Sequence, residues 1–125
     1  MAFENPCVKL VGVQAAADLS THQHKFVKIT AAEQVNVCSV LGEAAVGVLL
    51  NKPSAAGQAA EVATTGSIVK VVSSAAFAAG AVLTAAATGK AVTAAAGQYG
   101  HAIAIQAATA GDQLVTALLI PSGKV

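Results

Sequence analysis

The sequence has no arginine and no tryptophan, and charged residues make up only 10% of its 125 residues. Its positive charges are seven lysines scattered from Lys9 to Lys124, and the formal net charge is +1. Proteins that bind nucleic acids usually neutralise phosphates with several clustered Lys or Arg side chains. The absence of such a cluster along the sequence argues against a nucleic-acid partner.

Aromatic residues are also scarce, at 3%, whereas alanine supplies about a quarter of the chain. A buried methyl group removes much less apolar area from water than a buried aromatic ring does. The core of a single chain should therefore be modest, and we expect self-association to add to its stability.

Long runs of large apolar residues are missing as well. A long uncharged run, from Val71 to Gly89, consists mainly of Ala, Ser, Thr and Gly, and it contains one Leu and no Ile. Such a composition inserts poorly into a bilayer. Residues Met1 to Pro6 show no basic segment followed by an apolar one, which a secretory signal would need. We therefore expect no membrane partner and synthesis in the cytoplasm.

Patterns typical of metal sites are weak. The segment His22-Gln23-His24 can place two imidazoles on one side of an extended chain, but no C-x-x-C or H-x-x-x-H spacing joins them to His101, Cys7 or Cys38. We predict no metal site. Both cysteines are expected to stay reduced and to act as small hydrophobes.

Patterns typical of catalysis are missing too. A phosphate-binding loop around Gly89-Lys90 would need Gly five residues before Gly89 and Ser or Thr after Lys90, but these positions hold Thr84 and Ala91. No Gly-x-Ser-x-Gly motif is present and the acidic residues are dispersed. We predict no catalytic residue, no cofactor and no small-molecule substrate.

The clearest structural pattern is a β-hairpin near the C-terminus. Large and small side chains alternate with a period of two over His101–Ala107, a turn follows, and an apolar segment runs from Leu114 to Ile120. Because the second arm is apolar on both faces apart from Thr116, it is predicted to be a central strand that is covered on both sides.

Three Ala-Gly pairs precede extended segments and predict turns at Gly57, Gly80 and Gly111. Glycine tolerates the positive φ that tight reversals need, so each glycine is predicted to form the corner before a strand. The spacing of these corners is too irregular for a repeat protein.

Short alternating segments elsewhere predict further strands, at residues 26–30, 35–40, 45–50, 61–63, 67–72, 82–85 and 91–94. Thr64–Gly66 is interpreted as a hairpin turn, and Ser73–Ala79 as a single helical turn because Ala favours helix and Ser can cap it. The predicted fold class is all-β, with at most one or two helical turns.

The first residues follow a different pattern. Residues 1–24 are interpreted as an N-terminal arm with one short extended piece, Cys7–Val13, and residues 25–125 as a β-rich domain. The alternative is that the extended piece is the first strand of the domain's own sheet.

Several motifs occur in an order typical of a known family: Val46–Pro53, Ala56–Gln58, Gly66–Val71, Ala79–Thr84, Gly89–Val92 and Ala110–Asp112. The sequence from Phe26 to Ile120 resembles the capsid decoration, or cement, proteins of tailed bacteriophages. Members of this family have often been labelled as RecA/RadA-type phage recombinases.

The resemblance implies a small single-domain protein with a β-barrel or β-tulip-like fold and no enzymatic activity. It implies a homotrimer on the outer surface of the phage head, made in the host cytoplasm, that reinforces contacts between major capsid proteins. The alternatives are another virion component, such as a head fibre base or tail element, and a nucleotide-dependent recombinase.

The N-terminal arm is where we expect much of the capsid contact. The extended piece could add a strand to a sheet edge of a capsid subunit, or it could pair within its own domain. The candidate contact residues are Phe3, Pro6, Val8 and Leu10.

Overall fold

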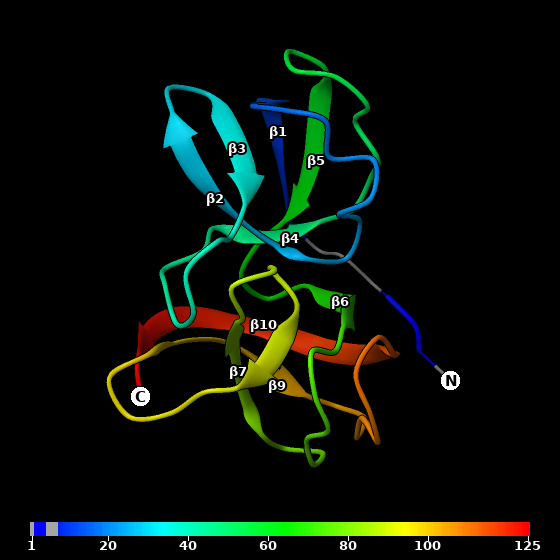
Figure 1. The fold of residues 1–125 in the computed structure, drawn as a ribbon, viewed down its shortest axis with the longest axis vertical. Helices are drawn as coiled ribbons and strands as arrows, with labels where there is room; N and C mark the ends of the chain where they lie inside the picture. Colours follow the sequence, from blue (N-terminus) through cyan, green and yellow to red (C-terminus); the bar gives the residue numbers. More distant parts are fainter. Residues whose placement is uncertain (1, 5–7) are drawn as a thin grey trace.

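The computed structural model describes residues 2–4 and 8–125, and it contains no helix within them. Two β-structures make up the protein: a closed barrel with strand order β1-β3-β2-β4-β5, and a five-stranded sheet with order β6-β10-β9-β7-β8 (Figure 1). The predicted all-β fold class with a barrel is confirmed. The strands are β1 (Lys9–Ala15), β2 (Phe26–Ala31), β3 (Gln34–Val37), β4 (Gly47–Leu49), β5 (Ala59–Ala63), β6 (Ile68–Val72), β7 (Val82–Ala85), β8 (Ala91–Thr93), β9 (Tyr99–Ala104) and β10 (Leu114–Lys124).

Strand β1 closes the barrel, because it pairs in parallel with β3 and antiparallel with β5. Its residues Val13 and Ala15 are buried in the barrel core beside Leu19, Val27 and Leu49. Of the two interpretations of the extended piece, pairing within its own domain is therefore the correct one for Lys9 onward. Cys7 lies outside the described residues. The prediction of an N-terminal arm does not hold for β1, because its apolar face is part of the core.

The predicted hairpins of the second half are confirmed. Strands β9 and β10 pair antiparallel with Ala104 opposite Ala117, and β7 pairs with β8 around the turn that contains Gly89. Strand β10 lies between β6 and β9 and is thus a central strand, as predicted. At the edges of the sheet, a bridge between Ser73 and Ala91 brings the end of β6 against β8.

Two local predictions are wrong. Thr64–Gly66 is not a hairpin turn, because β5 pairs with β1 and β4 whereas β6 pairs with β10, so this turn carries the chain from the barrel to the sheet. No helical turn forms at Ser73–Ala79 either, because the segment bridges to Ala91 and Ala108 and buries Phe77. Burial of one aromatic ring outweighs the weak helix propensity of the surrounding alanines.

The three predicted corners differ in their physical basis. Gly57 and Gly80 lie in turns with φ of 88° and 86°, in the left-handed region that favours glycine. The expected positive φ at Gly111 is wrong, since the left-handed residue in that turn is Asp112, with φ of 60°. At Gly111 the constraint is space, because a Cβ there would lie 2.9 Å from the backbone oxygen of Ser74.

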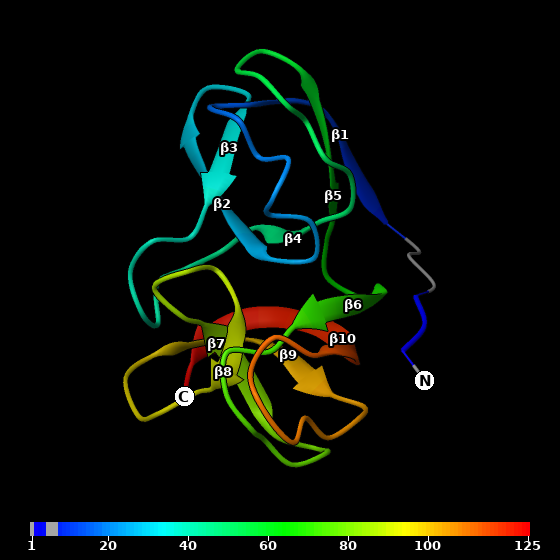
Figure 2. The ribbon, with the colours of Figure 1, turned by 45° about the vertical axis from the view of Figure 1, so that its right-hand side comes forward.

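A shared core joins the barrel to the sheet. Phe26, Cys38 and Val48 from the barrel half pack in one cluster with sheet residues that include Val71 and Leu119. The barrel and the sheet are stacked along the long axis of the molecule, with β6 and β10 next to the barrel (Figure 2). The chain is therefore a single domain. Within the shared core, burial raises the pKa of the free Cys38 thiol to about 12.

Candidate interaction surface

The three histidines lie in different environments, and no group of three or more His, Cys, Asp or Glu side chains able to hold a metal occurs in residues 2–4 and 8–125. The Nζ of Lys25 lies 3.1 Å from Nδ1 of His22, and it can donate to that nitrogen when the imidazole is neutral. Desolvation lowers the pKa of both His22 and His24. No helix in the described part of the chain is long and apolar enough to cross a membrane.

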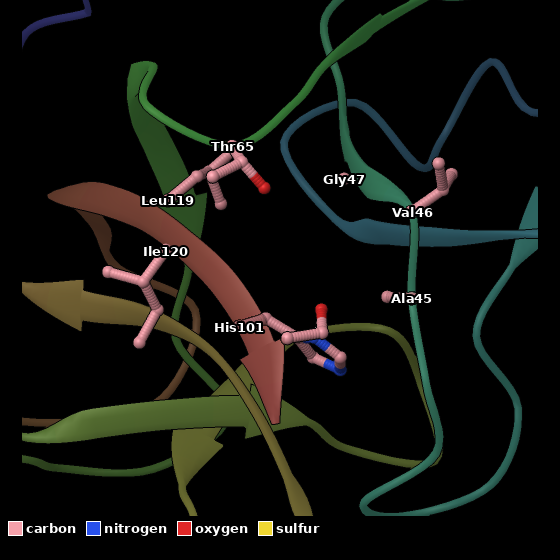
Figure 3. Close-up of a pocket in the computed structure, with 8 residues that line it drawn as sticks. Ala45, Val46, Gly47, Thr65, His101, Leu119 and Ile120 are labelled. Carbon is pink, nitrogen blue, oxygen red and sulfur yellow. The ribbon is translucent and has the colours of Figure 1, made fainter. Parts of the chain in front are cut away.

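His101 lines a small pocket between the barrel and the sheet (Figure 3). Its Nε2 lies 2.8 Å from the carbonyl oxygen of Glu43, so Nε2 carries the proton and donates it, while Nδ1 lies 2.8 Å from Oγ of Ser122 and accepts from that hydroxyl. The imidazole also packs against the Phe26 ring, with 5.4 Å between centroids. His101 is thus a structural link between β9, β10 and the segment before β4, and burial lowers its pKa.

The Gly89-Lys90 pair lies in the turn between β7 and β8. Lys90 forms an ion pair and hydrogen bond with Asp112, which lowers the pKa of that carboxyl. Thr84, where a phosphate-binding loop would need glycine, is fully buried on β7 opposite Val92. The lysine therefore links this turn to the turn before β10.

An aliphatic row crosses four strands of the sheet. Leu118 of β10 is opposite Ile68 of β6 and Ile103 of β9, and Ile103 is opposite Val82 of β7. Residues directly opposite each other in antiparallel strands point to the same face. All four side chains are partly exposed, whereas their neighbours along the strands belong to the core. The row therefore lies on the face turned away from the core.

Further apolar side chains extend this face. Leu114 and Phe3 are each 49% exposed. The backbone N–H of Phe3 donates to Oγ1 of Thr116 at 2.7 Å, and that hydroxyl donates back to the Phe3 carbonyl at 3.3 Å. Because Thr116 lies between Leu114 and Leu118 in alternate positions of β10, Phe3 rests on the same face. We call the aliphatic row together with Leu114 and Phe3 the apolar sheet face.

The other candidate contact residues are not brought together on this face. Val8 is exposed beside the start of β6, with its carbonyl 3.0 Å from the Ser67 hydroxyl. Leu10 is half-buried against the barrel core opposite Val62, and Pro6 lies outside the described residues. Of the three candidates that the structure describes, Phe3 alone thus joins the apolar sheet face.

The alternation of apolar residues did not predict this face, because a segment that is apolar on both sides indicates a strand covered on both sides. Leu114 is exposed and Leu118 only half-buried, so the second face of β10 is not fully covered by the described chain. Half-buried and buried residues also alternate in β6, from Ile68 to Val72, because one side of this strand faces the core and the other side is not fully covered. Only the pairing register, which joins these residues in space, reveals the surface.

No curated protein matches this sequence. A family model described as phage cement protein matches residues 9–119, which include β1 to β9 and most of β10. That family is structural and its name places it at the phage capsid. The match spans both the barrel and the sheet, and it agrees with the resemblance carried by the sequence motifs, so this chain belongs to the phage cement protein family.

Proposed function

We propose that this protein is a capsid decoration protein that binds the outer surface of a phage head and stabilises contacts between major capsid proteins. Membership of the cement family supports a structural role at the capsid. The structural observation that carries the proposal is the apolar sheet face. Soluble monomers rarely expose a large contiguous apolar patch unless it binds a partner.

The apolar sheet face is proposed to join copies of the chain into a homotrimer. Lys70, opposite Thr116 on the edge strand β6, is the one charged residue in β6, and β7 and β9 have none. Depletion of charge is typical of the buried centre of protein interfaces. A trimer would bind the capsid lattice through several weak contacts at once, and multivalency makes such binding tight.

Contacts with the capsid are proposed to involve the segment before β1. Val8 is exposed and belongs to no strand, whereas Phe3 lies on the apolar sheet face that is proposed to join the copies of the chain. From Lys9 onward the extended piece Cys7–Val13 is not free to pair with a capsid subunit, because β1 already has partners on both sides. The candidate contacts with the capsid are thus reduced to Pro6 and Val8.

The test of the proposed function is sedimentation of the purified protein with expanded and unexpanded phage heads, and separately with tails. We expect it to sediment with heads. Sedimentation with tails alone would favour the tail-element alternative. Saturable ATP binding that is lost in Lys90→Ala would instead favour the recombinase alternative.

The homotrimer is tested by light scattering on Leu118→Asp, with Ile29→Asp as the matched control. Ile29 is 57% exposed on the barrel strand β2, away from the apolar sheet face. We expect the Leu118 variant to be monomeric and the Ile29 variant to keep the wild-type mass. Equal masses for the wild type and both variants would rule out this face as the trimer interface.

A further inference from the structure

Lysines from four separate segments, one of which is the loop that precedes β2, lie close together. The backbone N–H of His24 donates to the carbonyl of Leu49 at 2.8 Å, and its own carbonyl accepts from Val72 N–H at 3.1 Å. These bonds place His24 between the end of β4 and the end of β6. Strands β4 and β6 lie where the barrel meets the sheet (Figure 2). Lys52 follows β4 and Lys70 lies in β6, so both are brought close to His24.

The fourth segment is the turn between β7 and β8. Phe26 N–H donates to the carbonyl of Gly89 at 2.8 Å, and a Cβ placed on Gly89 would lie 3.4 Å from Cβ of Lys25. Lys90 is therefore adjacent to Lys25. We call Lys25, Lys52, Lys70 and Lys90, together with His22 and His24, the lysine surface.

The charges of the lysine surface are incompletely neutralised within the chain. Lys90 is paired with Asp112, but Lys25, Lys52 and Lys70 form no salt bridge to any described residue. The carboxyls that face the cluster are Asp112, Glu4 near His24, and Asp18 near His22.

Burial and the neighbouring cations both lower pKa values within the lysine surface. The pKa of Lys25 is lowered by burial and then by Lys90, and the pKa of His24 is lowered by burial and by Lys70 and Lys52, against an opposing effect of Glu4. Carboxylates from a partner would relieve this repulsion, because opposite charges close to a cation favour its charged form.

We propose that the lysine surface binds an acidic protein surface on the phage head. This inference rests on the proposed function and assigns its capsid-contacting charges. A protein partner is favoured over nucleic acid because the surface has four lysines and no arginine, interspersed with three carboxylates, whereas nucleic-acid sites are usually more strongly cationic. Complementary charge mainly sets partner choice and the rate of association.

The experiment compares head binding of two variants with the same change in net charge. Lys25→Glu/Lys52→Glu reverses two lysines of the lysine surface that lie outside the apolar sheet face, and Lys9→Glu/Lys124→Glu reverses two lysines elsewhere on the molecule. We expect the first variant to bind heads roughly tenfold or more weakly and to lose the salt dependence of the wild type, and the control to change affinity much less. Circular dichroism checks that both variants are folded.

Three results would overturn the inference while leaving the proposed function intact. One is wild-type affinity for heads in the Lys25/Lys52 variant, and the second is an equal loss in both variants, which would reflect net charge alone. The third is binding to duplex DNA as tight as to heads and lost in the same variant, which would make the partner a nucleic acid. Failure of the wild-type protein to bind heads would instead contradict the proposed function itself.

Discussion

At Gly47 the backbone leaves no room for a side chain. A Cβ there would lie 1.9 Å from the carbonyl oxygen of Ala63, so an alanine would force β4 away from β5 at the barrel seam. We predict that Gly47→Ala destabilises the protein by about 2 kcal/mol or more, as overpacking against rigid backbone does. Gly123→Ala is the control, because nothing lies within 4 Å of its added Cβ. Similar urea midpoints for the two variants would contradict the prediction.

Gly111 shows what the sequence could and could not reveal about a single residue. An Ala-Gly pair before an extended segment predicted a turn at Gly111, because turn chemistry is local. The reason for glycine there is its distance to Ser74 across the fold, and no local pattern encodes that contact. Substitution with Ala should therefore already be destabilising at Gly111, without any need for a β-branched side chain.

His101 should make stability depend on pH. Burial lowers its pKa below the ordinary value of 6.5, so the unfolded chain binds a proton that the folded chain resists. Stability is therefore complete above about pH 6.5 and falls as the pH drops through that value toward the lower pKa of the folded state. Urea unfolding at pH 7.5 and 5.5 measures this loss.

The matched variant is His101→Gln, which keeps a donor for the Glu43 carbonyl but does not titrate. Burial also lowers the pKa of His22 and His24, so a part of the pH dependence should persist in this variant. We expect a smaller loss of stability between the two pH values than in the wild type. An identical loss would show that His101 does not contribute.

Among the elements, β1 decides where the folded domain begins. Val13 and Ala15 are buried in the barrel, and β1 is the strand that joins β3 to β5. We predict that a chain lacking residues 1–13 does not fold, whereas a chain lacking residues 1–8 keeps its β-structure. Circular dichroism and thermal unfolding of the two truncated chains give the answer. A folded chain without residues 1–13 would restore the interpretation of that segment as an independent arm.

Elements with local partners were predictable, and those with distant partners were not. The hairpins β7–β8 and β9–β10 were recognised because alternation and a turn lie within one short stretch of sequence. Closure of the barrel needs β1 to pair with β3 and β5. Strands β5 and β6 belong to different β-structures, and the turn between them is bonded to the sheet through Gly66 N–H and the Leu119 carbonyl. These pairings are set by tertiary packing, which alternation alone does not specify.

For the whole molecule, the surfaces proposed to bind partners arise only from the fold. The lysines appear scattered along the sequence, yet Lys25, Lys52 and Lys70 converge because His24 bonds to both Leu49 and Val72. The candidate contact residues were chosen by composition, and among Phe3, Val8 and Leu10, which the structure describes, Phe3 alone lies on the apolar sheet face. The family was recognisable from ordered motifs, but its contact surfaces required three-dimensional register.

The barrel and the sheet should unfold together, because Phe26, Cys38 and Val48 share one core cluster with sheet strands. Tyr99, the one tyrosine in a chain without tryptophan, reports on the sheet by fluorescence, while Cys38 reports on the barrel half by its reaction with thiol reagents in a Cys7→Ser background. In the folded state Cys38 should be unreactive, since it is buried and its pKa is raised to about 12. At one fixed protein concentration we expect both probes to give the same urea midpoint.

Val48→Ala should lower both midpoints equally, because it should reduce the free energy of unfolding of the whole domain by about 1 to 3 kcal/mol. A Tyr99 transition that does not move in this variant would mean that the sheet folds independently of the barrel.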